Sequence, residues 1–334
     1  MISSSYDFAG STVAISAEER EHFAGLHAFL ASLAVAATEN PAFRIVVQIA
    51  ESPALPRDAE ILHTGPVWDE PLAIYAVQGE RRLLLVPEKA LLVVDPKERT
   101  AILTVTKNAI SSVTGLCGMH AIDAAIEATG QMPLHGAALT LPDRSAGVLL
   151  HAASGVGKTT TTLQLAFDGF GVFTDDIAVV RLSGSGPLIW GLPRDFKIHK
   201  NSACLSARFA SLVSGNWDRN GEQPINREAL VNAGVRVEPA QPVPLRALVH
   251  LVRNEATSGR PTSVRPISRT EALYALVQDN VRGSDRGVPQ FQQRRMDQIA
   301  EIARDVIALE CCIGHDFASV GQRLLQALPE VDLR

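Results

Sequence analysis

The pattern of apolar and polar positions in the first 130 residues predicts an α+β unit. Four apolar residues recur at helical spacing, namely Phe23, Leu26, Leu30 and Leu33. Ser16 and Glu19 have the spacing of a capping box, so we expect that helix to begin near Ser16. Short apolar runs typical of strands in antiparallel hairpins follow at 43–49, 72–77, 82–86, 91–94 and 101–106. A helix of small residues is expected over 109–129, with Gly130 at its end.

From residue 131 the pattern changes to alternating strands and helices, which predicts a second domain over 131–334. Buried strands are expected at 146–152, 171–174, 177–182 and 246–253. Helices are expected at 159–169, 201–213, 269–280, 291–307 and 316–328. Polar residues at 214–226 and 282–290 indicate loops. The predicted fold class is therefore mixed α/β, with the smaller α+β unit of residues 1–130 in front.

Composition limits the kinds of protein that this chain can be. The 334 residues are 46% hydrophobic and 20% charged, which supplies a large core and argues against global disorder. A net charge of -5 argues against a protein that mainly neutralises a nucleic-acid backbone. The N-terminal residues lack the basic and apolar regions of a signal peptide, and every candidate membrane segment carries charges. We expect a cytoplasmic protein with no membrane or nucleic-acid partner and with four free thiols, Cys117, Cys204, Cys311 and Cys312.

The most informative motif is the segment 152–159, AASGVGKT. It matches the phosphate-binding pattern G-x-x-x-x-G-K-[ST], with Ala152 in place of the first glycine. Backbone N–H groups of such a loop turn toward an anion, the lysine reaches the β- and γ-phosphates, and the Thr hydroxyl can hold Mg²⁺. Because the motif joins an apolar strand to a helix, we predict that it binds ATP with Mg²⁺. The predicted nucleotide-binding residues are Ala153, Ser154, Gly155, Val156, Gly157, Lys158, Thr159 and Thr160.

Two neighbouring carboxylates, Asp175 and Asp176, directly follow the predicted strand 171–174. If that strand neighbours the strand before the phosphate-binding loop, both carboxylates lie near the metal and the γ-phosphate. One of them can ligate the metal while the other takes a proton from an acceptor hydroxyl. His135, just before a further expected strand, is the third candidate, although a lone histidine is more often structural. His151, at the start of the loop, has the same ambiguity.

Together, His135, the loop and the Asp175–Asp176 pair resemble HPr kinase/phosphorylase and its wider family. The resemblance covers residues 134–180, LHGAALTL…GVLLHAASGVGKTTTTLQLAFDGFGVFTDDIAVV, and continues faintly through GLPRDFKIHKNSA and VIALECCIGHDFASVGQRLL. It implies the P-loop fold that this family shares with phosphoenolpyruvate carboxykinase. It also implies Asp175 as the base that deprotonates the acceptor. Asp176 and His135 would arrange the base and the metal, with Thr159 and Asp176 as metal ligands and Lys158 as a catalytic cation.

The activity that the resemblance implies is Mg-ATP-dependent phosphorylation of a hydroxyl. The acceptor would be a serine of a peptide or protein, or a small hydroxyl compound, because divergent members of the family accompany peptide-modification pathways. Arg194 and Lys197 are candidate contacts to phosphate or acceptor. The alternative is a nucleotide-binding regulatory module or weak ATPase without an acceptor. Carboxykinase-like chemistry would need further metal and substrate ligands that the sequence does not reveal, and the sequence is compatible with a homo-oligomer.

Overall fold

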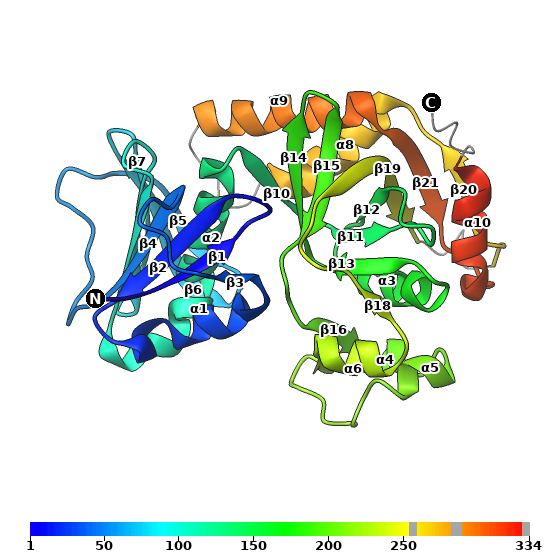
Figure 1. The fold of residues 1–334 in the computed structure, drawn as a ribbon, viewed down its shortest axis with the longest axis horizontal. Coiled ribbons are helices and arrows are strands. Elements are labelled where there is room, and N and C mark those ends of the chain that lie inside the picture. The colour runs from blue at the N-terminus through cyan, green and yellow to red at the C-terminus, as the bar shows by residue number, and fades with distance from the viewer. Residues whose placement is uncertain (254–258, 282–288, 329–334) are drawn as a thin grey trace. The chain divides into compact units, whose positions relative to one another are not determined.

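The computed structural model describes residues 1–253, 259–281 and 289–328 (Figure 1). The chain divides into two compact units, which are described separately. The first comprises Met1–Pro133 and Val281–Arg294, and the second comprises Leu134–Asn280 and Arg295–Arg334. The sequence alone placed the division after residue 130 and carried no sign that Val281–Arg294 groups with the first unit. The protein is a mixed α/β structure with two large mixed sheets, one of them curled into a half-barrel.

The first unit contains a nine-stranded sheet in the order β3-β1-β2-β4-β9-β8-β7-β6-β5. Its strands are β1 (Ile2–Asp7), β2 (Thr12–Ala17), β3 (Ala34–Val35), β4 (Phe43–Ile49), β5 (Glu60–Val67), β6 (Glu70–Gln78), β7 (Arg81–Val86), β8 (Ala90–Asp95) and β9 (Thr100–Val105). The run from β5 to β9 is antiparallel, as predicted, but β4 pairs parallel to both β2 and β9. The strands β1, β2, β3 and β5 were not predicted.

The helical segments of the first unit are η1 (Arg20–Phe23), α1 (Ala24–Phe29), η2 (Ala31–Leu33), η3 (Lys107–Thr114) and α2 (Leu116–Ala128). The predicted apolar stripe from Phe23 to Leu33 is confirmed, because all four of its residues are buried. The predicted capping box is wrong. Ser16 lies in β2, and Glu19 at the N-cap makes no side-chain capping hydrogen bond. Ser16 is instead held by the backbone pairing of β2 with β1 and β4.

The second unit contains a ten-stranded sheet with the path β10-β14-β15-β19-β12-β11-β13-β18, extended by β21 on β19 and β20 on β21. Its strands are β10 (Gln131–His135), β11 (Ala137–Thr140), β12 (Gly147–His151), β13 (Gly171–Thr174), β14 (Ile177–Ser183), β15 (Gly186–Gly191), β18 (Arg236–Val237), β19 (Val243–Val252), β20 (Ser263–Pro266) and β21 (Ile307–Cys312). A separate hairpin pairs β16 (Phe196–His199) with β17 (Glu222–Ile225). The four predicted strands of this unit are present, and each observed end lies within three residues of the expected one.

The helical segments of this part of the chain are α3 (Lys158–Phe167), α4 (Lys200–Ala203), α5 (Ala207–Ala210), α6 (Arg227–Asn232), α8 (Arg269–Asn280), α9 (Pro289–Asp305), η4 (Phe317–Ser319) and α10 (Val320–Ala327). The expected helix over 201–213 is two short helices, since Cys204, Leu205 and Ser206 interrupt it. The expected loop over 214–226 contains β17, and residues 282–288 of the other expected loop lie outside the described residues.

A single apolar cluster joins one face of this sheet to α3, α5, α6 and α10. Leu150 on β12, Leu163 on α3 and Val249 on β19 belong to it, and each is 1% exposed or less. In Figure 1 the sheet separates α3 from α8, which contacts β19 and β21. The cluster therefore fixes α3 against the strand that precedes it.

Two further expectations concern thiols and membranes. All four cysteines are free, with Cys117 and Cys311 buried and Cys204 exposed. Among the described residues, no helix has the length and apolar character needed to cross a bilayer.

Candidate functional site

Three strand ends meet at one edge of the second unit's sheet. β11 pairs antiparallel with both β12 and β13, so β12 and β13 point the same way and end at the same edge. β19 pairs parallel with β12 on its other side and ends there too. The expectation that β13, which precedes Asp175, directly neighbours β12 is wrong, because β11 lies between them. The carboxyl ends still converge, which is where open α/β sheets bind ligands.

The predicted phosphate-binding loop connects β12 to α3 at this edge. Gly155 and Gly157 have φ values of 81° and 112°, in the left-handed region that side chains disfavour. Ala152, at the first-glycine position, is fully buried in the apolar cluster. The loop therefore needs its two later glycines for conformation, whereas an alanine fits its first position.

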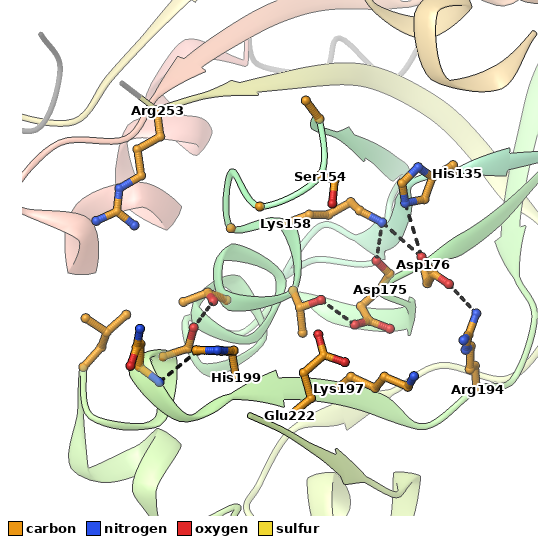
Figure 2. Close-up of a pocket in the computed structure, with 18 of the residues that line it drawn as sticks. His135, Ser154, Lys158, Asp175, Asp176, Arg194, Lys197, His199, Glu222 and Arg253 are labelled. Carbon is orange, nitrogen blue, oxygen red and sulfur yellow. Dashed lines mark hydrogen bonds and ion pairs between the residues drawn. The ribbon is translucent and has the colours of Figure 1, made fainter. Parts of the chain in front are cut away.

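The loop borders a cavity of about 810 Å³ (Figure 2). The cavity is lined by His135, Ala153, Ser154, Gly155, Gly157, Lys158, Thr159, Thr160, Asp175, Asp176, Arg194, Asp195, Lys197, His199, Asn201, Ser202, Leu205, Glu222 and Arg253. Every predicted site residue is among them except Val156, which packs against the apolar cluster. The structure thus brings together residues from three separate parts of the sequence.

Asp175 is oriented by the first turn of α3. The Thr159 hydroxyl donates a 2.7 Å hydrogen bond to its Oδ2 atom, and the Lys158 ammonium donates to its backbone carbonyl at 3.1 Å. The residue is only 3% exposed, and this burial raises the pKa of its carboxyl to about 6, against the lowering effect of the Thr159 hydrogen bond. Its Oδ1 atom accepts no hydrogen bond from a described residue. Asp175, which lines the cavity, therefore has Oδ2 fixed by Thr159 and Oδ1 without a hydrogen-bond donor among the described residues.

Asp176 faces a cluster of basic groups instead. Its Oδ1 atom lies 3.4 Å from both His135 Nε2 and Lys158 Nζ, and Arg194 forms an ion pair with Oδ2 (Figure 2). Burial alone would raise the pKa of this carboxyl. The His135 hydrogen bond and the charges of Lys158 and Arg194 outweigh burial and hold the pKa below its usual range. Asp176 is thus a permanent anion that positions three basic side chains.

The His135–Gly136 dipeptide is attached to the same turn. The Gly136 N–H donates to the Asp176 carbonyl at 2.9 Å, and the His135 N–H donates to the Asn280 side chain at 2.7 Å. A Cβ atom at Gly136 would lie 2.8 Å from the Leu149 side chain, so a larger residue would displace this segment. The dipeptide therefore sets the position of the His135 ring beside Asp176. His151, in contrast, is buried and does not line the cavity. Its ring stacks on the His250 ring, with 5.4 Å between the two ring centroids.

Sequence reasoning missed the β16–β17 hairpin, which supplies one wall of the cavity. Phe196 and Ile198 are buried in the apolar cluster, while Lys197 and His199 alternate with them and line the cavity. Glu222 pairs with His199 in the β16–β17 register and also lines the cavity. The alternation of FKIH was the available signal, but four residues are too few for a firm strand prediction. Leu205 and Arg253, also missed, carried no pattern at all.

The opposite pKa shifts of the two carboxyls predict opposite effects on stability. The folded chain holds a proton on Asp175 more tightly than the unfolded chain, since its pKa is about 6 rather than 3.8. Its stabilising contribution is present at low pH and is lost as the pH rises through about 6. Asp175→Asn should therefore raise the free energy of unfolding by about 3 kcal/mol at about pH 8 and change it little at about pH 4.

Asp176→Asn is the matched control for this prediction. The pKa of Asp176 is lowered, so its contribution is present above the ordinary carboxyl pKa and is lost as the pH falls. This variant should lower the free energy of unfolding at about pH 8, as urea denaturation would measure. Shifts of the same sign in both variants would contradict the electrostatic description of the pair.

Comparison with known proteins gives no independent identification of this site. No protein-family model matches the chain, and no curated protein matches it.

Proposed function

We propose that this chain is a Mg-ATP-dependent phosphotransferase that moves the γ-phosphate of ATP to a hydroxyl group. The observation that carries the proposal is the direct bonding of the phosphate-binding loop to the acidic pair: Thr159 to the Asp175 carboxylate, and Lys158 to Asp176. Such contacts are expected where a loop binds phosphates and the carboxylates serve the reaction beside them. The finer fold that we propose for residues 131–334 is the P-loop domain of the HPr kinase and phosphoenolpyruvate carboxykinase type.

The loop would hold the phosphates through its backbone N–H groups and the N-terminus of α3, which has ten residues. The Lys158 side chain would move from its contacts with Asp175 and Asp176 to the β- and γ-phosphates. Arg194, held beside Asp176, would remain close enough to balance charge on the transferred group, and the nearby His135 ring could hydrogen-bond to it. The protein would thus contribute mainly positioning and charge, as phosphoryl transfer requires.

The residues present suit Mg²⁺. The Thr159 hydroxyl and the Asp175 carboxylate are neighbouring oxygen donors, and Mg²⁺ prefers oxygen ligands, often one or two from protein with the rest from phosphates and water. When bound, the ion neutralises charge on the β- and γ-phosphates. The sequence assigned the metal to Thr159 and Asp176. Because Asp176 is already paired with Arg194 and Lys158, we propose Thr159 and the Oδ2 side of Asp175 instead.

Asp175 would also serve as the base. Its Oδ1 atom would take the proton of the acceptor hydroxyl while the hydroxyl oxygen bonds to the γ-phosphorus. The bond from that phosphorus to the β–γ bridging oxygen breaks, and ADP leaves with the electron pair. Thr159 fixes the orientation of the base through Oδ2. The acceptor class that we propose is a serine of a peptide or protein, or a small hydroxyl compound.

Transfer of label from γ-labelled ATP into a host-cell extract tests this proposal. Protein, peptide and small-molecule fractions would be separated after incubation with Mg²⁺ and with the wild type, Lys158→Ala or Asp175→Asn. We expect label in one fraction with the wild type and in none with either variant. Release of labelled free phosphate alone would contradict the kinase proposal and favour a nucleotide-controlled module or weak ATPase.

A further inference from the structure

We propose that Arg253, at the end of β19, and the α4 segment bonded to Thr160 bind the base and ribose of the nucleotide. The nucleoside subsite consists of Asn201, Ser202, Leu205 and Arg253, all of which line the cavity. This inference rests on the proposed function, because it assumes that the loop holds a triphosphate.

The direction of the nucleotide follows from the order of the strands. Lys158, which reaches the β- and γ-phosphates in loops of this kind, contacts Asp175 and Asp176 at the end of β13. The γ-phosphate end therefore lies on the β13 side of the P-loop strand. Because β19 pairs with β12 on its opposite side, the α-phosphate and nucleoside extend toward β19. The acceptor must meet Asp175, so it occupies the other end.

Arg253 directly follows the last residue of β19. It is an exposed residue and lines the cavity. Figure 2 shows it on the far side of Lys158 from Arg194 and His135. Within the described chain, its guanidinium makes no ion pair or hydrogen bond, unlike Arg194, which is paired with Asp176. A planar guanidinium stacks well on an aromatic ring such as a nucleobase. Arg253 can therefore cover one face of the base.

Leu205 is an apolar residue in a cavity otherwise lined largely by polar groups. It is 53% exposed, and it separates α4 from α5 rather than joining the apolar cluster. An exposed leucine contributes nothing to the core, but it offers apolar surface that a purine or pyrimidine ring can cover. A phosphate or a charged acceptor would gain nothing from that surface.

The polar part of the subsite is held against the P-loop helix. The Thr160 hydroxyl, one residue past Thr159, shares a 2.7 Å hydrogen bond with the Ser202 hydroxyl. This bond anchors the α4 segment beside the position expected for the α-phosphate. The neighbouring Asn201 side chain makes no hydrogen bond with a described residue, so its amide can donate to and accept from ribose hydroxyls or a base edge. The four side chains together provide stacking, apolar contact and hydrogen bonding.

Paired titrations with Mg-ATP and Mg-tripolyphosphate test the subsite, because tripolyphosphate has the phosphates without the nucleoside. The variants Leu205→Ala and Arg253→Ala should weaken ATP binding about 5-fold and about 10-fold, from lost apolar contact and lost stacking. Asn201→Ala should weaken it about 5-fold through a lost hydrogen bond. Binding of tripolyphosphate should stay within about 2-fold of the wild type in all three. Unchanged ATP affinity, or equal losses for both ligands, would overturn the assignment.

Two controls separate this inference from the proposed function. Val231→Ala and Arg260→Ala remove an exposed apolar residue and an exposed arginine outside the cavity lining, and they should leave both affinities unchanged. Lys158→Ala should weaken both ligands together. If both ligands depend on Lys158 but ATP binds no better than tripolyphosphate, the subsite fails while the phosphate site stands. If neither ligand binds the wild type, the proposed function and the subsite both fail.

Discussion

Replacing Lys158 by alanine should weaken Mg-ATP binding about 100-fold and remove phosphoryl transfer, since two charge-assisted contacts to phosphate are lost. The Lys158 side chain is only 11% exposed. Its ammonium already contacts the Asp176 carboxylate and the Asp175 backbone carbonyl. In the nucleotide-bound protein those partners would be exchanged for phosphate oxygens, which carry more charge. Isothermal titration with Mg-ATP measures the loss directly.

The matched control is Lys200→Ala. Lys200 is exposed at the start of α4, close in sequence to the cavity wall, but it does not line the cavity. This variant should bind Mg-ATP as the wild type does. Circular dichroism of both variants would show that the fold is retained. Wild-type affinity in Lys158→Ala would exclude the loop as the phosphate site.

Asp175→Asn should reduce transfer about 1000-fold, the contribution typical of a positioned general base. It should also weaken Mg-ATP binding, because the Asp175 carboxylate is one of the two proposed Mg²⁺ ligands. A base must be unprotonated, and burial places the pKa of Asp175 at about 6 in the free protein. The wild-type kcat/KM should therefore rise with pH up to about 6 and then level off. In Asp175→Asn this rise should disappear from the residual activity.

Asp176→Asn distinguishes the two carboxylates. It should lower transfer by releasing Arg194 and His135 from their positions, but it should retain a rise of kcat/KM with pH. The base assignment is wrong if the rise persists in Asp175→Asn and vanishes in Asp176→Asn. In that case the proton would pass to the His135–Asp176 pair.

The sequence predicts the chemical center of the site better than its surroundings. The loop and the acidic pair are local motifs, and the strands on which they depend are strongly apolar, so their positions could be derived. The place of β11 between β12 and β13 could not, because strand order depends on pairing between distant residues. The sequence also could not predict that Asp175, and not Asp176, contacts Thr159, because this depends on how the two side chains are oriented within one turn.

The other features that the sequence did not predict correctly have two physical causes. Ser16 and Glu19 have capping-box spacing, but backbone pairing of β2 with its neighbours outweighs a local cap. The strands β16 and β17 are short and separated by a polar segment, so their alternation is visible only once the hairpin is known. Leu205 and Arg253 belong to the cavity through tertiary structure alone, and no local signal marks them.

The central claim is that the γ-phosphate reaches an acceptor rather than water. Measuring ADP and free phosphate in the same reaction, with Mg-ATP and the labelled fraction of the extract, tests it most directly. We predict that ADP exceeds free phosphate by the amount of phosphorylated product, and that the excess disappears in Asp175→Asn. Equal amounts of ADP and free phosphate with the wild type would contradict the claim and identify the chain as an ATPase.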